Sequence, residues 1–360
     1  MGENETLRLK RHYSIVAHSP DDVELRYGVW NPVSFTLTDE AKSGSLFRLV
    51  SRLDGSASPA QLAKDENVPR EDVETLIDHM LGLGVLESTS SSSLDHYLDD
   101  ILPWRVDGGS PSDRPIVLLG DRELAVEIQR YLQASLPGTP ITPVEADDPA
   151  WVALNDGDTS WLSDGLNLQE KLLVFEGWRD TFLVFATKVI NPVQLRMVNR
   201  ICLELRIPWI HAAIDGPFLF VGPIFIPHRS ACYECLEIRV MMNLRESGSY
   251  QRYKRAIIER QVEEGQIPVE PAINGVLSSH TVLETLNFAL TGSSFTVSKV
   301  LAIYLPTMEF TYNEVLRAPS CTSCSPSPER DDKETYFDAG AFIGRSNDTS
   351  LTTSLSRKVP

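Results

Sequence analysis

Apolar and polar positions in the first ninety residues follow the pattern of a small α+β module. Alternation with period two predicts three short strands, and apolar stripes at helical spacing then predict three helices and a closing strand. The strands cover residues 13–17, 23–27 and 33–37, the third helix covers 70–83, and the closing strand covers 85–86. This order is typical of a winged helix-turn-helix, which we assign to residues 1–88.

A run of serine and threonine after this module indicates a linker, assigned to residues 89–114. Beyond it, apolar strands alternate with helices, which is typical of an α/β sheet. The strands are expected at 115–119, 172–175, 182–186, 207–213 and 218–225, and helices at 120–132 and 193–205. We assign an α/β domain to residues 115–325 and interpret the polar remainder, 326–360, as a loosely held tail.

The charge balance argues against nucleic acid and anionic membranes as partners. The 360 residues include 33 Lys and Arg against 50 Asp and Glu, a net charge of −17, whereas a phosphate backbone favours basic surfaces. Residues 1–87 carry 9 basic and 15 acidic side chains, so the winged helix is not expected to read DNA. There is no apolar run of membrane-spanning length and no secretory signal, so we expect a cytoplasmic protein.

Four of the five cysteines form two C-x2-C pairs, which indicate one metal site. Cys232 and Cys235 make the first pair, and Cys321 and Cys324 make the second. Four thiolates from two tight turns are the ligand set of a structural zinc ion, Zn²⁺. A redox dithiol and an iron–sulfur cluster are the alternatives. The fifth cysteine, Cys202, is interpreted as a small apolar side chain of a helix.

The turn after the strand at 115–119 is where a nucleotide-binding fold carries a glycine-rich loop. Here the turn reads Gly120-Asp-Arg-Glu-Leu-Ala, in which only the first glycine of the fingerprint stands. Asp121 and Glu123 place negative charge where a phosphate would bind. We therefore predict a degenerate Rossmann-like fold, with no ATP bound by this chain.

Several short motifs in the second half of the chain occur together. They are Asn199-Arg200, Gly222-Pro223, Pro227, Ala231-Cys-Tyr-Glu-Cys-Leu236 and the second cysteine pair. This set resembles the ThiF-type, ubiquitin-activating-like proteins of azole-forming peptide biosynthesis, also called cyclodehydratase C or ocin-ThiF-like proteins. The resemblance covers nearly the whole chain. In that family the winged helix is the RiPP recognition element, which binds the leader of a ribosomally made precursor peptide.

The resemblance implies a non-catalytic scaffold that binds the leader and presents the core peptide to a YcaO cyclodehydratase for ATP-dependent azoline formation. The leader would add as a strand beside the third strand and face the third helix, the mode called β-augmentation. The peptide-binding residues expected there are Val33, Ser34, Phe35, Thr36, Leu37, Glu74 and Asp78. Because no YcaO domain follows in the sequence, we expect that enzyme to be a separate subunit. Whether the chain forms a homodimer is left open by the sequence.

Two departures from the family pattern weigh against catalysis by this chain. The glycine fingerprint is degraded, and Lys188 stands where active relatives often carry an aspartate after Ala-Thr. The alternative function is a ThiF-type enzyme that uses ATP to adenylate a peptide carboxyl terminus. Measured ATP binding would separate this alternative from the scaffold.

Overall fold

The computed structural model describes residues 6–98, 114–162, 164–263, 265 and 267–325. The chain divides into two compact units, Met1–Arg105 and Val106–Pro360. None of the described helices is both long and apolar enough to cross a bilayer. The predicted tail, 326–360, lies outside the described residues, as does most of the predicted linker.

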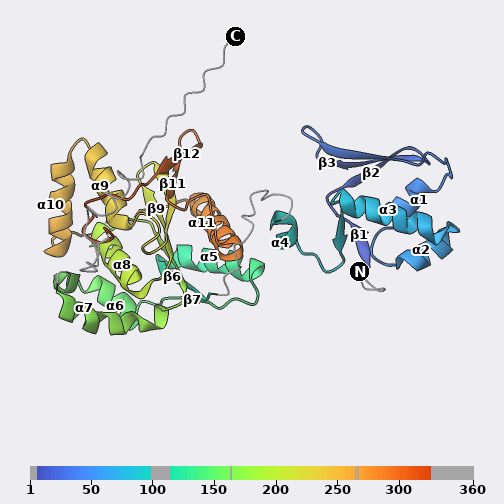
Figure 1. The fold of residues 1–360 in the computed structure, drawn as a ribbon. Coiled ribbons are helices and arrows are strands. Elements are labelled where there is room, and N and C mark those ends of the chain that lie inside the picture. Colours follow the sequence, from blue (N-terminus) through green and yellow to red (C-terminus); the bar gives the residue numbers. More distant parts are fainter. Residues whose placement is uncertain (1–5, 99–113, 163, 264, 266, 326–360) are drawn as a thin grey trace, which may run out of the picture. The chain divides into compact units, whose positions relative to one another are not determined.

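The N-terminal unit packs two small antiparallel sheets against helices (Figure 1). One sheet has the strand order β2-β3-β4, and β1 pairs with β5 in the other. The strands are β1 (Leu7–Leu9), β2 (Ser14–Ser19), β3 (Asp22–Tyr27), β4 (Val33–Thr38) and β5 (Leu86–Ser88). The helices are α1 (Leu46–Ser51), α2 (Pro59–Glu66), α3 (Arg70–Gly82) and α4 (Ser93–His96). Apolar side chains from both sheets and from α1 to α3 form one core.

Local signals explain where these helices begin. The Ser58 side chain accepts a hydrogen bond from the Gln61 N–H, and Pro59 occupies the first turn of α2. Ser92 caps α4 in the same way, within the predicted linker. The strand β1 was not predicted, because three residues are too few to show a period. It closes the unit by pairing with β5.

The second unit is built on a seven-stranded mixed sheet with the order β12-β11-β10-β9-β8-β6-β7. β6 to β9 are parallel, whereas β10 to β12 are antiparallel to their neighbours. The strands are β6 (Ile116–Gly120), β7 (Ile141–Pro143), β8 (Phe182–Thr187), β9 (Trp209–Asp215), β10 (Phe218–Phe225), β11 (Lys299–Tyr304) and β12 (Glu309–Glu314). This sheet confirms the predicted α/β class and is consistent with a Rossmann-like domain.

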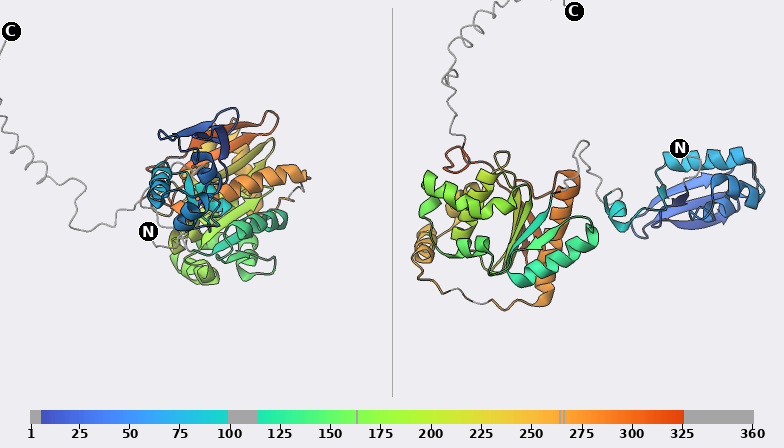
Figure 2. Two further views of the ribbon diagram at one scale, coloured as in Figure 1. Left: turned by 90° about the vertical axis from the view of Figure 1, so that its right-hand side faces the viewer. Right: turned by 90° about the horizontal axis from the view of Figure 1, so that it is seen from below.

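Helices cover both faces of this sheet (Figure 2). They are α5 (Arg122–Ser135), α6 (Pro149–Asn155), α7 (Gly165–Leu172), α8 (Pro192–Leu205), α9 (Tyr233–Asn243), α10 (Ser247–Ile258) and α11 (Pro271–Thr291), with 3-10 helices η2 (Ser160–Leu162) and η3 (Leu173–Trp178). α5 and α11 pack together on one face, and α6 and α8 lie on the other. One apolar core fills the space under α6 to α8 and buries Trp161, Phe175 and Trp209.

The predicted strand at 172–175 is wrong. These residues end α7 and begin η3. Phe175 and Trp178 are buried, whereas Leu173 and Val174 are exposed, so burial recurs every three residues and not every two. A short apolar run does not by itself distinguish a strand from a helical turn.

Candidate metal centre and peptide-binding edge

The four paired cysteines meet in one buried cluster. Their Sγ atoms all lie within 4.8 Å of one another. The Cys235–Cys324, Cys232–Cys321 and Cys232–Cys235 sulfurs are 3.4, 3.6 and 3.9 Å apart, and all four thiols are free. A tetrahedral zinc ion with Zn–S bonds of about 2.3 Å holds its sulfurs roughly 3.8 Å apart. The cysteines are therefore positioned to hold a metal ion of this kind.

Polar residues within the two C-x2-C turns join them to each other. Glu234, inside the first turn, accepts a hydrogen bond from Thr322 Oγ1 of the second turn at 2.8 Å. The Arg196 Nε donates to the other oxygen of this carboxylate at 3.1 Å. The Ala318 N–H donates to Cys235 Sγ at 3.3 Å. Such contacts orient ligands around a metal and stabilise negative charge on sulfur.

The ionisation of the thiols is coupled. Hydrogen bonding with Cys324, followed by burial, raises the pKa of the Cys232 thiol, and burial raises the pKa of Cys235 to about 11. The same contact with Cys232 lowers the pKa of Cys324 to about 5. A divalent cation would replace these protons, because metal-bound thiols are deprotonated. The donor set, its burial and its sulfur distances all fit zinc.

At the corner between β6, β8 and α5, where related folds bind phosphate, Lys188 contacts two carboxylates. The Lys188 N–H donates to the Asp121 carboxylate at 2.5 Å, and the Lys188 ammonium pairs with Glu123. Gly120 has a φ of +117°, and a Cβ there would lie 1.9 Å from Ala186 O. This glycine is therefore required by the contact between two strand ends.

β4 is an edge strand whose outward backbone groups can be assigned. The Asp39 N–H donates to Asp21 O just beyond the β3–β4 ladder, and the ladder has no register shift. Hydrogen-bonded and non-hydrogen-bonded pairs alternate in an antiparallel ladder, so the Phe35 N–H points to β3. Ser34 and Thr36 consequently direct their N–H and C=O groups to the open edge.

The two faces of β4 differ in burial. Leu37 is buried and Phe35 is half-buried against the core of the unit, whereas Val33, Ser34 and Thr36 are exposed. The apolar side of α3 contributes to the same core. A strand added to this edge would therefore have an apolar side towards the interior and a polar side towards solvent.

The two acidic residues predicted on the third helix are exposed. Glu74 and Asp78 both lie on α3, away from its buried side. Glu74 pairs with Arg70 at 2.7 Å. Among the described residues, no hydrogen bond or ion pair joins Glu74 or Asp78 to β4, although both lie on the same unit as β4.

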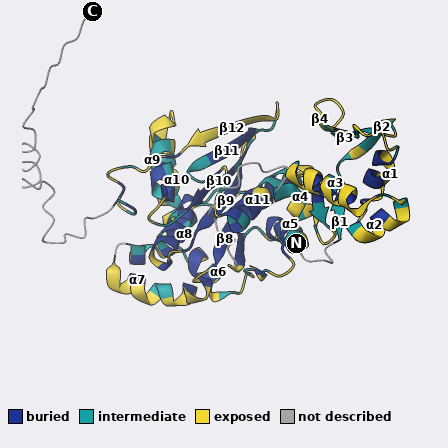
Figure 3. Ribbon diagram, turned by 45° about the vertical axis from the view of Figure 1, so that its right-hand side comes forward, coloured by how far each residue is buried: buried dark blue, intermediate teal, exposed yellow. Residues whose placement is uncertain are grey.

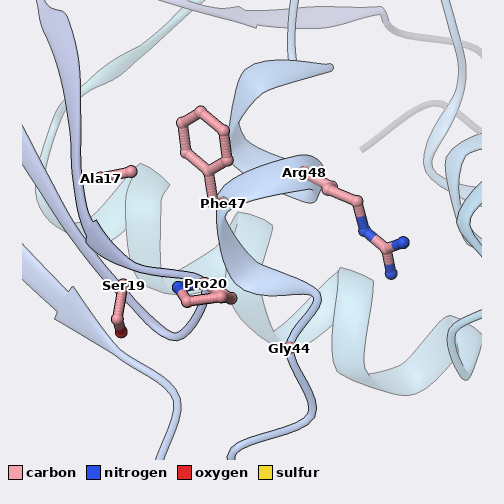
Figure 4. A pocket seen from close by; sticks show the side chains of 6 residues that line it. All are labelled: Ala17, Ser19, Pro20, Gly44, Phe47 and Arg48. Atoms are coloured by element: carbon pink, nitrogen blue, oxygen red, sulfur yellow. The ribbon is translucent and has the colours of Figure 1, made fainter.

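A pocket opens at the opposite edge of the same sheet, between β2 and α1 (Figure 4). It is lined by Ala17, Ser19, Pro20, Gly44, Phe47 and Arg48. The Phe47 side chain is 37% exposed there. None of the peptide-binding residues predicted from the sequence lines this pocket, so it is separate from the β4 edge.

The fold is shared with two heterocyclases and with a microcin biosynthetic enzyme. A heterocyclase solved with its substrate and cofactor has a TM-score of 0.60 and 15% identity, over 89% of this chain and 40% of that chain. The heterocyclase TruD has a TM-score of 0.60 and 18% identity, over 89% and 43%. The microcin C7 biosynthetic enzyme MccB, solved with N-formylated MccA, has a TM-score of 0.50 and 14% identity, over 88% and 99%. At these identities the likeness shows a common fold.

The coverage differs between these structures. This chain spans about two-fifths of the length of the two heterocyclases, at 40% and 43%, but 99% of MccB. No family model and no curated protein matches the chain.

Sequence reasoning missed two polar contacts of these sites. Glu234 and Thr322 lie inside the C-x2-C turns, and their position between the cysteines was a usable signal for the link between them. The pairing of Lys188 with Glu123 joins residues 65 positions apart, and nothing in the local sequence of either residue indicates it.

Proposed function

We propose that this chain is a scaffold subunit that binds the leader of a ribosomally made precursor peptide and presents its core to a YcaO-type cyclodehydratase for azoline formation. The observation that carries the proposal is the open edge of β4, where Ser34 and Thr36 offer outward N–H and C=O groups. The fold shared with two heterocyclases supports the reaction class.

The leader would add to β4 as a further strand. Its affinity would come from main-chain hydrogen bonds to Ser34 and Thr36, and its specificity from side chains that alternate between the two faces. Apolar leader residues would lie beside Phe35 and Leu37, which already border the core. Charged leader residues would lie towards the exposed side of α3.

Proline substitution tests this strand addition. Ser34→Pro removes an outward N–H but no hydrogen bond of the β3–β4 ladder, and edge strands tolerate proline. The affinity for a labelled leader peptide, measured by fluorescence anisotropy, is expected to fall about tenfold, because a hydrogen bond of about 1.4 kcal/mol is lost. Thr36→Pro should have the same effect.

Ser34→Ala is the matched control, since it keeps the N–H and should bind the leader like the wild type. Circular dichroism melts of each variant establish that the N-terminal unit is folded. If Ser34→Pro and Thr36→Pro are folded and bind the leader with unchanged affinity, strand addition at β4 is wrong.

We also propose that the four cysteines hold one structural zinc ion. Metal analysis of the purified chain should then give one zinc per molecule, and Cys321→Ser should lose it. Cys202→Ser is the control, because Cys202 is a buried thiol on α8 outside the cluster, and this variant should keep its zinc. Purified protein without any thiophilic metal would contradict the proposal.

A second candidate function is adenylation of a peptide carboxyl terminus. The length of the structural match favours this candidate, because the match extends over 99% of the MccB chain but only 40% of the first heterocyclase chain. Against it, Asp121 and Glu123 place carboxylates at the corner where phosphates would bind, and Lys188 contacts both of them. We infer that this chain does not bind ATP. Isothermal titration with ATP and magnesium should show no saturable binding, whereas carboxylate-dependent pyrophosphate exchange would establish the enzyme instead.

A further inference from the structure

β12 is an open edge of the seven-stranded sheet and is exposed along its whole length (Figure 3). None of the described strands pairs with its outer side. Phe310 and Tyr312 are 46% and 51% exposed on this strand. An exposed edge that carries aromatic side chains is a site for pairing with another chain.

The aromatic residues of β12 stand beside α11. The rings of Phe310 and His280 have centroids 5.4 Å apart, and Leu283, three residues further along α11, is 39% exposed. Tyr312 shares a face with Phe310, because side chains two residues apart in a strand point the same way. We call His280, Leu283, Phe310 and Tyr312 the β12–α11 surface. Exposed apolar side chains at the two ends of β12 are Met308 and Leu316.

The same two aromatic residues carry the outward backbone groups of β12. The Val315 N–H donates to Ser298 O at 2.8 Å, and the β11–β12 register continues from there without a shift. By alternation, the Thr311 N–H points to β11. Phe310 and Tyr312 therefore direct N–H and C=O groups away from the sheet, so an added strand would pair with them and contact their rings.

We propose that the β12–α11 surface docks an extended segment of the cyclodehydratase subunit, which adds to β12 as an eighth strand. This rests on the proposed function. The segment would carry apolar residues at alternate positions against Phe310 and Tyr312. It would also carry a Lys or Arg opposite Glu309, because Glu309 has no cation within 4.0 Å among the described residues, whereas Lys299 lies 3.9 Å from Glu314.

Charge favours a segment with basic residues over a second copy of the chain as the occupant of this edge. Each copy carries a net charge of −17, and pairing of β12 with itself would bring together edges that each contain Glu309 and Glu314. Like charges at such a contact oppose association, whereas a basic strand gains from the same residues.

The test measures binding of the full chain to a YcaO-type cyclodehydratase subunit from the same organism, by biolayer interferometry. Tyr312→Pro removes an outward N–H and leaves the β11–β12 ladder intact, so the affinity should fall at least tenfold. Phe310→Ala keeps the backbone and removes a ring, and should cost about tenfold or more. Asn313→Ala is the matched control, because its side chain lies on the other face of β12, and it should bind like the wild type.

The outcomes separate this docking site from the proposed function. If Tyr312→Pro and Phe310→Ala are folded and bind the subunit as tightly as the wild type, docking at β12 is overturned and the scaffold function stands. If the wild-type chain binds a leader peptide but not the YcaO-type subunit, the scaffold function fails and docking fails with it. If Phe310→Asp abolishes dimers of this chain while subunit binding persists, the surface is a self-interface and the proposal is overturned.

Discussion

At the scale of single residues, Gly120 joins β6 to β8 through backbone contact. Gly120→Ala would place a Cβ 1.9 Å from Ala186 O at a φ of +117°, so we expect the free energy of unfolding of the C-terminal unit to fall by about 3 kcal/mol. Gly138→Ala is the control, because no atom lies within 4 Å of its Cβ, and its effect should stay under about 1 kcal/mol. Urea unfolding followed by tryptophan fluorescence measures both. Equal stability of the two variants would show that the strand ends can move apart freely.

His211 makes stability depend on pH. It lies buried on β9, and burial lowers its pKa to about 3, whereas an unfolded histidine has a pKa of about 6.5. The folded pKa is the lower one, so protonation favours the unfolded state. Above pH ~6.5 His211 is neutral in both states and does not lower the free energy of unfolding. Below that pH the free energy of unfolding declines by roughly 1.4 kcal/mol per pH unit as the pH falls towards 3.

A neutral variant isolates this effect. His211→Leu lacks the buried titrating group. The difference in the free energy of unfolding, variant minus wild type, should therefore increase by roughly 1.4 kcal/mol for each pH unit below ~6.5. Loss of a metal ion in acid affects both proteins and cancels in the difference. Urea unfolding at pH 7.5, 5.5 and 4.5 provides the measurement. A constant difference across this range would mean that His211 accepts a proton in the folded state.

At the scale of elements, periodicity identified the segments with a complete apolar face. β8 and α8 were predicted at 182–186 and 193–205, and the structure confirms both, because β8 is buried throughout and α8 buries one continuous side. β12 was not predicted, although Phe310 and Tyr312 alternate with polar residues, because only two apolar positions fall within its six exposed residues. Its place depends on pairing with β11, which local sequence does not encode.

In the candidate sites too, some features follow from the local sequence and others depend on the whole fold. The two C-x2-C pairs predicted a single site of four cysteines, and the structure places their sulfur atoms within 4.8 Å of one another. The local sequence does not show how they meet, because α9 and the turn after β12 lie far apart in the sequence and are brought together by the fold. For the β4 edge, the alternation predicted a short strand, but only the pairing with β3 shows that the Ser34 N–H points outwards.

At the scale of the molecule, each unit has a core of its own. The core of the N-terminal unit contains β4, whereas the cysteines form a small core with apolar residues of the C-terminal unit. Tryptophan fluorescence can follow the second unit, because Trp161 and Trp209 are buried in it, while Trp30 of the first unit is 99% exposed. A change in the fluorescence of the buried Trp161 and Trp209 therefore reports the unfolding of the second unit.

Removal of the proposed zinc ion should destabilise only the C-terminal unit. Zinc binding to a structural site contributes directly to folding, so Cys321→Ser, or the wild type stripped by a chelator, should lower the midpoint seen by tryptophan fluorescence by roughly 10 °C. Below both transitions, the affinity for a labelled leader should stay at the wild-type value, because β4 and its core belong to the other unit. Cys202→Ser, which keeps the four ligands, should retain its zinc and bind the leader equally well. Loss of leader binding together with the metal would mean that the peptide site needs the folded C-terminal unit, and β4 alone would not account for recognition.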